Sequence, residues 1–455
     1  MIKIGLMELY IKLYDDKNLT EIRDRVDPFY EKLAVALEGE GFEVMRFPIC
    51  RVKDEFRACV DAFEAAGVDC IVTWHAAYSP SLESIEVLAN TKLPIVVLDT
   101  TETFDFSCAS DPAEINMNHG IHGVMDMTSM LKRFGKPYAI AAGHYPNSDV
   151  IKRVAGYVRA AAGAMSLKGS RVGTVGGSFD GMGDFLISDE ELLETFGVTA
   201  VYADGETLTK LRSEVSDEDV AAEVKLDMES FRPLNDISAE THEKTERNCL
   251  AVRKWIENEK LDAFTVNFLE IRPENGLVVM PFIEASKAMA RGVGYAGEGD
   301  VLTAAITGAL MRGFGETAFV EIFCPDWKNG SVCLSHMGEV NLALTAQTPE
   351  IKEIPFTFGN ADDPVVCYGC YKAGEAVFVN VFKDSEKYNM LISPVTMLDN
   401  AGDKFEGTVR GWMKPHMPLE KFLEEISREG VTHHSTLVYN RSTSELRYFG
   451  ELLGL

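Results

Sequence analysis

The first third of the chain alternates short β-branched runs with amphipathic stretches, and this alternation constrains the fold more than any other feature. The strand-like runs fall at residues 2–6, 42–47, 70–74, 94–98 and 138–142. Between them, residues 19–37 and 55–66 carry apolar side chains at helical spacing. Buried strands that alternate with amphipathic helices predict parallel βαβ units and a doubly wound, Rossmann-like sheet.

The remainder of the chain divides in two by its texture. A second series of strand-like runs lies at 171–175, 198–202, 263–268 and 293–296. It predicts another doubly wound parallel sheet, and the polar stretch 213–246 within it predicts surface helices and a long connection. After Ala318, Thr, Val and Gly become frequent and strand-like runs follow one another closely, which predicts an antiparallel β-barrel or sandwich.

The length supports this division, because 455 residues are too many for one ordinary hydrophobic core. We expect an N-terminal α/β domain at 1–167, a central α/β domain at 168–317 and a C-terminal β-rich domain at 318–455.

Composition excludes several classes of protein. With 44 basic and 71 acidic residues, the formal net charge is -27 and it is scattered along the chain. Such a field repels phosphate backbones and anionic lipid, so we expect neither a nucleic-acid nor a membrane partner. No apolar run approaches the roughly 20 residues of a membrane helix, and the N-terminus does not resemble a signal peptide. Nine irregularly spaced cysteines favour a reduced, cytoplasmic protein.

Two acidic residues stand where chemistry is expected. Glu298 lies between two glycines in the turn from a predicted strand to a predicted helix, at the end of a sheet where ligands bind. Asp300, in the same turn, is typical of a helix cap. Glu321 lies in the apolar run 318–324, where a carboxylate is costly to bury unless it is paired, protonated or bound to metal. A strand alternation that points Glu321 at solvent is equally compatible with the pattern.

Three histidines complete the set of candidate ligands. His336 follows a strand-like run, and the pair His433-His434 precedes the strand-like run 435–439. A lone histidine is more often structural than a ligand. Two adjacent histidines on one strand point to opposite faces, so we expect at most one of this pair to be a ligand. Two carboxylates with two imidazoles are what a divalent cation such as Mn²⁺ takes when nitrogen and oxygen share a site.

The order and spacing of these phrases resemble a known family. The runs that carry the likeness to the metal site of the L-arabinose isomerases, which we group with the L-fucose isomerases, are 264–305, 319–321, 335–340 and 430–436. Runs 116–123, 143–145 and 160–163 are similar to further segments of that family. The likeness extends over nearly the whole chain and includes the order of the domains.

The resemblance implies an activity and a set of roles. It implies a metal-dependent aldose–ketose isomerase that transfers a proton between C1 and C2 of an open-chain sugar through an enediol. Its metal would be Mn²⁺, with Co²⁺ or Mg²⁺ as alternatives, held by Glu298, Glu321, His336 and His434. Glu298 and Glu321 would also be the acid/base groups, in an order left open. Residues implied to contact the sugar are Tyr10, His119, His122, Phe268 and His433. The resembled family also implies a homo-oligomer, a trimer or hexamer.

The sequence departs from the family around the sugar. Where the family carries Gly-Ser-Gln-His-Leu-Tyr, this chain has Leu6-Met7-Glu8-Leu9-Tyr10, so the glutamine has become Met7 or its contact has moved to Glu8. A second substrate-facing glutamine is replaced by His119. Because a site built for one sugar rejects analogues that leave its polar groups unpaired, we expect a substrate other than L-arabinose. The alternatives are an isomerase or epimerase for a modified sugar, and a non-catalytic sugar-binding protein.

Three weaker signals receive structural interpretations. The glycine-rich run 173–177 lacks the full dinucleotide-binding spacing, and we expect it near the cleft with Phe179 or Met182 as wall residues. The pair Cys367 and Cys370 has no second pair at zinc spacing, so it predicts buried thiols. His242 lies in a charged stretch and is expected to be solvated.

Overall fold

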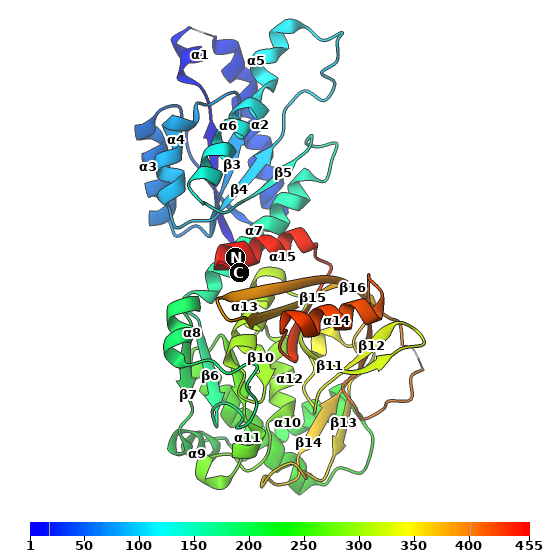
Figure 1. Cartoon of the computed structure of the whole chain (residues 1–455). Helices are drawn as coiled ribbons and strands as arrows, with labels where there is room; N and C mark the ends of the chain where they lie inside the picture. The colour runs from blue at the N-terminus through cyan, green and yellow to red at the C-terminus, as the bar shows by residue number, and fades with distance from the viewer. Residues whose placement is uncertain (18, 401) are drawn as a thin grey trace. The chain divides into compact units, whose positions relative to one another are not determined.

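The computed structural model describes residues 1–17, 19–400 and 402–455. These residues form two compact units (Figure 1). Unit 1 comprises 1–165 with 447–452, and unit 2 comprises 166–446 with 453–455. The predicted boundary between 317 and 318 lies inside unit 2, and the division into three domains stays a prediction.

Unit 1 is built on a five-stranded sheet in the order β2-β1-β3-β4-β5, and every pair is parallel. The strands are β1 (Lys3–Leu9), β2 (Glu43–Arg46), β3 (Cys70–His75), β4 (Ile95–Asp99) and β5 (Tyr138–Ala142). Each one overlaps a strand-like run of the sequence. The prediction of a doubly wound parallel sheet is therefore confirmed for this unit.

Helices cover the two faces of this sheet. The helices of unit 1 are α1 (Lys12–Asp16), α2 (Thr20–Gly39), α3 (Lys53–Ala65), α4 (Ser81–Asn90), η1 (Pro112–Glu114), α5 (Ile115–Asn118), α6 (Gly120–Arg133), most of α7 (Val150–Leu167) and most of α15 (Thr443–Leu453). Met7 and Leu9 pack in one core cluster with residues of α3, α4 and α6. On the other face, Tyr30 of α2 donates to the carbonyl of Leu6, and Tyr448 of α15 donates to that of Ile95.

The alternation of β1 settles which way its polar residue faces. Because Met7 points into the α3 side of the core, Glu8 points to the α2 side, where it interacts with Arg23 and Asp27. Burial first, and then Asp27, raises the pKa of Glu8 to about 8. Met7 is therefore a core residue.

Unit 2 begins with a second parallel sheet, in the order β10-β9-β6-β7. Its strands are β6 (Arg171–Val175), β7 (Thr199–Tyr202), β9 (Ala263–Val266) and β10 (Gly294–Gly297). Its helices are α8 (Asp189–Phe196), α9 (Gly205–Ser213), α10 (Asp217–Ser230), α11 (Ala239–Glu259), η2 (Phe268–Glu270), η3 (Pro273–Asn275), α12 (Phe282–Ala290) and α13 (Val301–Phe314). The predicted second α/β fold is confirmed.

A closed six-stranded barrel in the order β11-β12-β17-β16-β15-β18 follows in the same unit, and its neighbouring strands are antiparallel. The strands are β11 (Thr317–Asp326), β12 (Ser331–Ser335), β15 (Gly374–Lys383), β16 (Tyr388–Met397), β17 (Gly411–Pro415) and β18 (His434–Tyr439), with the helices η4 (Leu342–Leu344) and α14 (Leu419–Glu429) in the connections. Closure leaves no unpaired sheet edge. It decides between the two predicted alternatives in favour of the barrel.

A small sheet joins the polar stretch to the C-terminal region. It has the order β14-β13-β8, with β8 (Arg232–Pro233), β13 (Glu350–Glu353) and β14 (Val365–Tyr368). The sequence did not indicate it. The stretch 213–246 was predicted to be a surface segment, and this is wrong in part, because Asp227, His242 and Glu246 are buried within it. The solvated position predicted for His242 is wrong, since only 2% of it is exposed.

Helix α13 connects the second sheet to the barrel. Every one of its residues except Arg312 is buried, as expected for a helix that is apolar on all sides. It packs against β9 and β10 of the sheet and against β11 and β18 of the barrel. The N-terminus of α13 therefore lies where the carboxyl ends of the sheet strands meet the first barrel strands.

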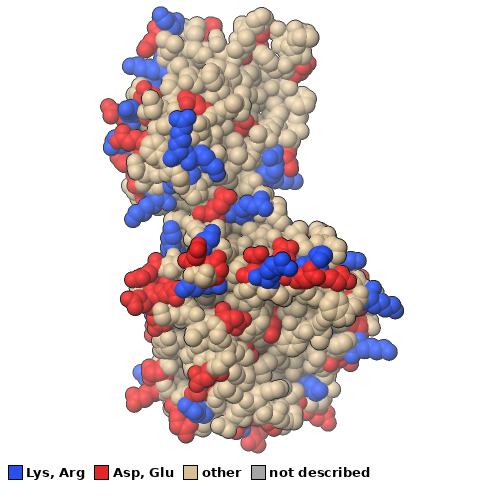
Figure 2. All heavy atoms as spheres, viewed as in Figure 1, with Lys and Arg blue, Asp and Glu red and all other residues tan. Residues whose placement is uncertain are grey.

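The surface agrees with the scattered charge of the sequence. Acidic and basic side chains are interspersed over the face shown in Figure 2. Among the described residues, no helix is both long enough and apolar enough to cross a membrane. None of the nine cysteines is in a disulfide, and Cys367 and Cys370 are buried as predicted.

Candidate active site

Glu298 occupies a turn that demands unusual backbone geometry. It follows β10 directly and has φ +62°, a conformation that residues with side chains rarely adopt. A Cβ on the next residue, Gly299, would lie 2.1 Å from the carbonyl oxygen of Gly177, and one on Gly297 would lie 2.7 Å from the ring of His336. Glycine is therefore required on both sides of Glu298. Strain of this kind is found where a functional side chain must be aimed.

Asp300 has two contacts, one with each oxygen. Its Oδ1 accepts the backbone N–H of Thr303 at 2.9 Å and caps α13, so the predicted helix cap is confirmed. Its Oδ2 lies 3.0 Å from Nδ1 of His434. The cap thus links the turn of the sheet to a barrel strand.

The barrel register brings the other candidate ligands together. Glu321 on β11 is directly opposite His434 on β18. On its other side it is opposite Ser335 on β12, and His336 follows Ser335. Two sets of side chains, Glu298–His433–His434 and Glu321–His336–His434, each offer three ligand atoms within 4.8 Å of one another. Residues far apart in sequence therefore converge, with His434 shared by both sets.

Both buried imidazoles are anchored at Nδ1 by a carboxylate. Nδ1 of His336 lies 2.6 Å from Oε2 of Glu339, whose other oxygen accepts the hydroxyl of Tyr295 at 2.7 Å. Nδ1 of His434 is anchored by Asp300 in the same way. Such partners fix the tautomer and orient Nε2 for a ligand, as in protein metal sites.

The free ring nitrogens face the two glutamates. Nε2 of His434 is buried without a hydrogen-bond partner and lies 3.5 Å from Oε2 of Glu298. Nε2 of His336 lies 3.9 Å from Oε2 of Glu321. Two imidazole nitrogens, one of them buried without a partner, and two carboxylates form a donor set that fits a divalent cation. Glu298, Glu321, His336 and His434 are thus residues that could hold a metal.

The electrostatics of the two glutamates differ. Burial raises the pKa of Glu298, but interactions with His433 and His434 outweigh it and lower the pKa to about 2. Burial also raises the pKa of Glu321, and there the nearby imidazoles do not cancel the effect. Burial lowers the pKa of His434, but Asp300 and Glu298 outweigh this effect and raise the pKa to about 9.

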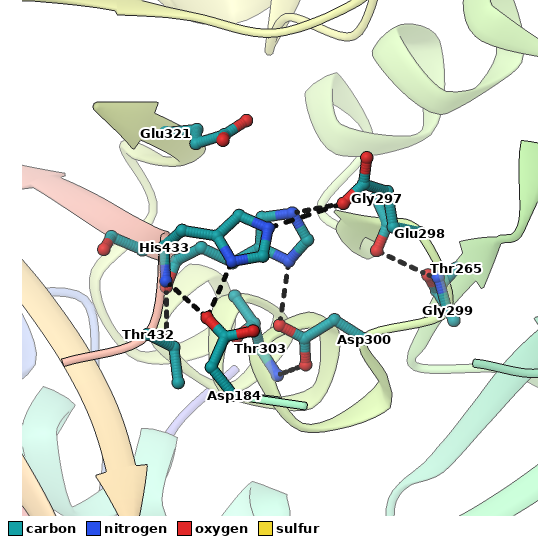
Figure 3. A network of polar contacts seen from close by, with 12 residues as sticks. Asp184, Thr265, Gly297, Glu298, Gly299, Asp300, Thr303, Glu321, Thr432 and His433 are labelled. Carbon is teal, nitrogen blue, oxygen red and sulfur yellow. Dashed lines mark hydrogen bonds and ion pairs between the residues drawn. The ribbon is translucent and has the colours of Figure 1, made fainter. Parts of the chain in front are cut away.

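His433 departs from the geometry predicted for it. It lies one residue before β18, so the two adjacent rings do not take opposite faces, and their centroids are 4.2 Å apart. Its Nε2 lies 3.4 Å from Oε2 of Glu298, and Figure 3 shows its ring between Glu298 and Asp184. Asp184 accepts at 2.6 Å from Nδ1. Sequence reasoning missed Asp184, because an aspartate in a glycine-rich loop carries no distinguishing signal.

The loop that carries Asp184 also contacts the Glu298 turn. The backbone N–H of Phe179 donates to the carbonyl of Glu298 at 3.0 Å. The ring of Phe179 lies 5.4 Å from that of Phe268, the predicted wall residue at the start of η2. The glycine-rich run 173–177 therefore leads into the site as expected. Of its two expected wall residues, Phe179 is at the Glu298 turn.

The remaining predicted sugar contacts belong to unit 1. Tyr10 is buried with its hydroxyl unpartnered, and its ring lies 5.8 Å from that of Tyr14. The Tyr14 hydroxyl is 3.0 Å from Nε2 of His119. His122 stacks on Tyr78 with ring centroids 4.5 Å apart. The structure groups Tyr10 with His119, and the roles of all three predicted residues stay predictions.

A second acidic and imidazole cluster lies in unit 2 between α10, α11 and α12. Asp227, His242 and Glu246 offer ligand atoms within 4.8 Å of one another. Nε2 of His242 lies 3.0 Å from Asp227. The ammonium of Lys287 contacts Asp227, and it lies 3.7 Å from Glu246 and 2.7 Å from Glu223. We call these five residues the Lys287 cluster. A cation from the chain already occupies it.

Fold and site together define a class: an α/β protein whose second parallel sheet abuts a closed barrel, with a histidine and carboxylate centre suited to a divalent cation at the junction. Comparison with known families agrees with this class. Profiles of the L-arabinose isomerase N-terminal, central and C-terminal domains match residues 9–169, 191–314 and 316–455, in this order. The chain belongs to the L-arabinose isomerase family.

Individual relatives match along most of their length. The L-arabinose isomerase of Shouchella clausii is 25% identical, over 97% of this chain and 91% of its own. That of Acidothermus cellulolyticus is 26% identical, over 88% and 82%. That of Nocardioides sp. is 24% identical, over 95% and 89%. The resemblance seen in the sequence is confirmed.

Proposed function

We propose that this protein is a metal-dependent aldose–ketose isomerase acting on an open-chain sugar through an enediol, with Mn²⁺ as its metal and Co²⁺ or Mg²⁺ as alternatives. The observation that carries the proposal is the pair of ring nitrogens, Nε2 of His336 and Nε2 of His434, that each face a glutamate, the latter buried without a hydrogen-bond partner. Membership of the L-arabinose isomerase family supports the same chemistry.

The chain itself supplies proton transfer and orientation. Isomerisation moves the C2 proton of an aldose to C1 and the O2 proton to O1, with no net gain or loss. Two carboxylates suffice for this, one for the carbon proton and one for the hydroxyl proton. We assign these roles to Glu298 and Glu321. A bound divalent cation would supply Lewis-acid stabilisation of the negative charge on the sugar oxygens.

The surroundings of the two glutamates serve the same chemistry. Asp300 and Glu339 keep the Nε2 atoms of His434 and His336 directed at the carboxylates. Phe268 is proposed as a wall and His433 as a contact to a sugar hydroxyl. From unit 1 we propose Tyr10, His119 and His122 as further sugar contacts. The turn that carries the family's glutamine has Met7 and Glu8 in this chain, and His119 stands for a second glutamine, so the preferred sugar is proposed to differ from L-arabinose.

The test is isomerisation by metal-stripped protein of a panel of aldoses and ketoses, before and after addition of Mn²⁺, Co²⁺ or Mg²⁺. We expect turnover that metal restores and that Glu298→Gln abolishes. Glu375→Gln is the matched control, because Glu375 is an exposed glutamate on the barrel strand β15. Ketose formation would define the class and identify the sugar in one experiment.

Two outcomes would contradict the proposal. Mn²⁺ bound at one ion per chain without ketose from any sugar would count heavily against isomerase activity. Failure to bind any of the three metals would remove the four-ligand centre. Sugar binding without turnover in that case would favour the alternative of a non-catalytic sugar-binding protein.

Two further properties are part of the proposal. A homo-oligomer, trimer or hexamer, is supported by apolar side chains exposed on α5, α6 and the preceding loop of unit 1, namely Phe104, Phe106, Ile115, Ile121 and Met125. Mass photometry that gives only a monomer would exclude it. A cytoplasmic location is supported by nine free thiols, and fractionation of the source cells tests it.

A further inference from the structure

Three imidazoles at the site share one arrangement, and only two of them are buried deep within the fold. His336 has Glu339 at Nδ1 and His434 has Asp300 at Nδ1. His433 repeats the arrangement with Asp184, whose Oδ2 lies 2.6 Å from its Nδ1. The side chains of His433 and Asp184 are 32% and 37% exposed, whereas those of the other two pairs are at most 4% exposed.

Asp184 holds His433 at two points. The same oxygen that faces Nδ1 also accepts the backbone N–H of His433, at 2.9 Å. With Nδ1 donating to Asp184, the lone pair of the neutral ring is at Nε2. That nitrogen lies 3.4 Å from Oε2 of Glu298. A single carboxylate thus sets the rotation of the ring and determines which nitrogen accepts.

Asp184 is itself held by its loop. The next residue, Phe185, stacks on His434 with ring centroids 5.1 Å apart and an interplanar angle of 12°. Earlier in the loop, Phe179 donates its backbone N–H to the carbonyl of Glu298. The loop between β6 and α8 therefore contacts both the Glu298 turn and the His433-His434 pair. Asp184 lies in this loop between Phe179 and Phe185, and Figure 3 shows it next to His433.

We propose that Asp184 is a positioning residue, which fixes the ring of His433 beside Glu298 so that Nε2 of the neutral ring can accept a hydrogen bond from a sugar hydroxyl. The inference rests on the proposed isomerase function. Asp184 acts through His433 and does not itself contact the sugar. Partners of this kind change activity or metal affinity by roughly 10–100-fold when they are removed from imidazoles in metal sites.

The experiment compares Asp184→Ala, Asp184→Asn, His433→Ala and the double variant Asp184→Ala/His433→Ala, with the sugar that the panel identifies. Asp180→Ala is the matched control, because Asp180 is an exposed aspartate of the same loop. We expect Asp184→Ala to lower kcat by roughly 10–100-fold with little change in Mn²⁺ affinity. Asp184→Asn, whose amide oxygen can still accept both N–H groups, should recover most of this loss. The double variant should be no slower than His433→Ala.

A second measurement needs no turnover. Long-range ¹H–¹⁵N spectra of the metal-free protein, at a pH high enough to leave the rings neutral, report which nitrogen of His433 carries the proton. We expect Nδ1–H in the wild type and in Asp180→Ala, and a mixture in Asp184→Ala. An Nε2–H tautomer in the wild type, or wild-type kcat in Asp184→Ala, would overturn the positioning role. If the wild type turns over no sugar, the proposed function fails, and the spectra still decide the role of Asp184.

Discussion

Two clusters of acidic and imidazole side chains lie in unit 2, and they differ in the cation that balances their negative charge. In the Lys287 cluster the cation is part of the chain, since the ammonium of Lys287 contacts Asp227 and lies within 4 Å of Glu223 and Glu246. The candidate metal centre consists of Glu298, Glu321, His336 and His434. In the described chain, the ion pairs of its two glutamates are with histidines and not with lysine or arginine.

The two clusters also differ in how their histidines are arranged. His242 contacts Asp227 within the Lys287 cluster through its Nε2. At the metal centre the anchoring contact is made by Nδ1, and Nε2 is left to face the glutamates. Ligand atoms within 4.8 Å of one another are thus common to both places. The candidate metal centre and the Lys287 cluster differ in which histidine nitrogen is anchored and in whether a cation of the chain is already there.

The largest effect is expected in the Lys287 cluster. Lys287→Met leaves buried carboxylates without their cation, and removing one partner from a buried ionic network typically costs about 3–5 kcal/mol. We expect the urea midpoint of unfolding to fall strongly, with Mn²⁺ affinity unchanged in the folded protein. Lys225→Met on α10 is the control, because its side chain is 76% exposed, and it should change stability little. A Lys287→Met protein as stable as the wild type would break the comparison.

At the metal centre, loss of a ligand should act on binding instead of stability. Loss of a residue that only hydrogen-bonds to a metal ligand typically weakens metal binding by at most roughly 100-fold. We expect His336→Gln, which removes a proposed ligand itself, to weaken Mn²⁺ binding by more than this. Titration of the metal-stripped protein followed by electron paramagnetic resonance measures this. His242→Gln in the Lys287 cluster is the matched control and should bind Mn²⁺ like the wild type. Equal losses in both variants would show that the two clusters are not distinct.

The sequence predicted one of these clusters and missed the other, for a physical reason. Glu298 stands between glycines at a strand end and Glu321 in an apolar run, so each breaks a local pattern. His242 and Glu246 break none, since charged residues one turn apart are normal on a surface helix. Only the packing of α11 against α10 and α12 buries them. Their function as a network depends on contacts that no local pattern encodes.

The same limit applies to the site and the fold. The alternation of strand-like and helical runs was sufficient to predict both parallel sheets, because central strands such as β3, β6 and β9 are buried on both faces. The sequence did not decide between a barrel and a sandwich, because closure of the barrel depends on the long-range pairing of β11 with β18. The sequence also did not predict that Asp184, Asp300 and Glu339 anchor histidine rings. They depend on which ring atom each carboxylate meets.

A smaller effect is expected from the outer partner of a metal ligand. Glu339→Gln keeps the shape of the side chain but weakens the acceptor at Nδ1 of His336, so we expect Mn²⁺ affinity to fall by roughly 10-fold. Calorimetric titration with Mn²⁺ would measure it. Tyr295→Phe removes only the hydroxyl that donates to Glu339, and its effect should be smaller still. A Glu339→Gln protein that binds Mn²⁺ like the wild type would show that the anchor at Nδ1 does not tune the centre.

The smallest effect is a difference in pH dependence between the two clusters in the metal-free protein. Burial raises the pKa of Glu246 well above 4.5, while Lys287 opposes the shift. Above pH 4.5 the folded chain therefore keeps a proton that the unfolded chain loses, and the free energy of unfolding falls as pH rises, by at most about 1.4 kcal/mol per pH unit. Glu246→Gln removes this term, so its stability relative to the wild type should increase as pH rises above 4.5.

Glu298→Gln is the control for that slope. The pKa of Glu298 is lowered to about 2, so its contribution to stability is present above pH 4.5 and is lost only as pH falls toward 2. Between pH 5 and about 6, where His434 is protonated in the folded and unfolded chains, it should leave the slope of the unfolding free energy against pH unchanged. Urea unfolding of the three proteins at several pH values decides the matter. Parallel slopes for Glu246→Gln and the wild type would mean that Glu246 is ionised in the fold, with Lys287 as its full counter-ion.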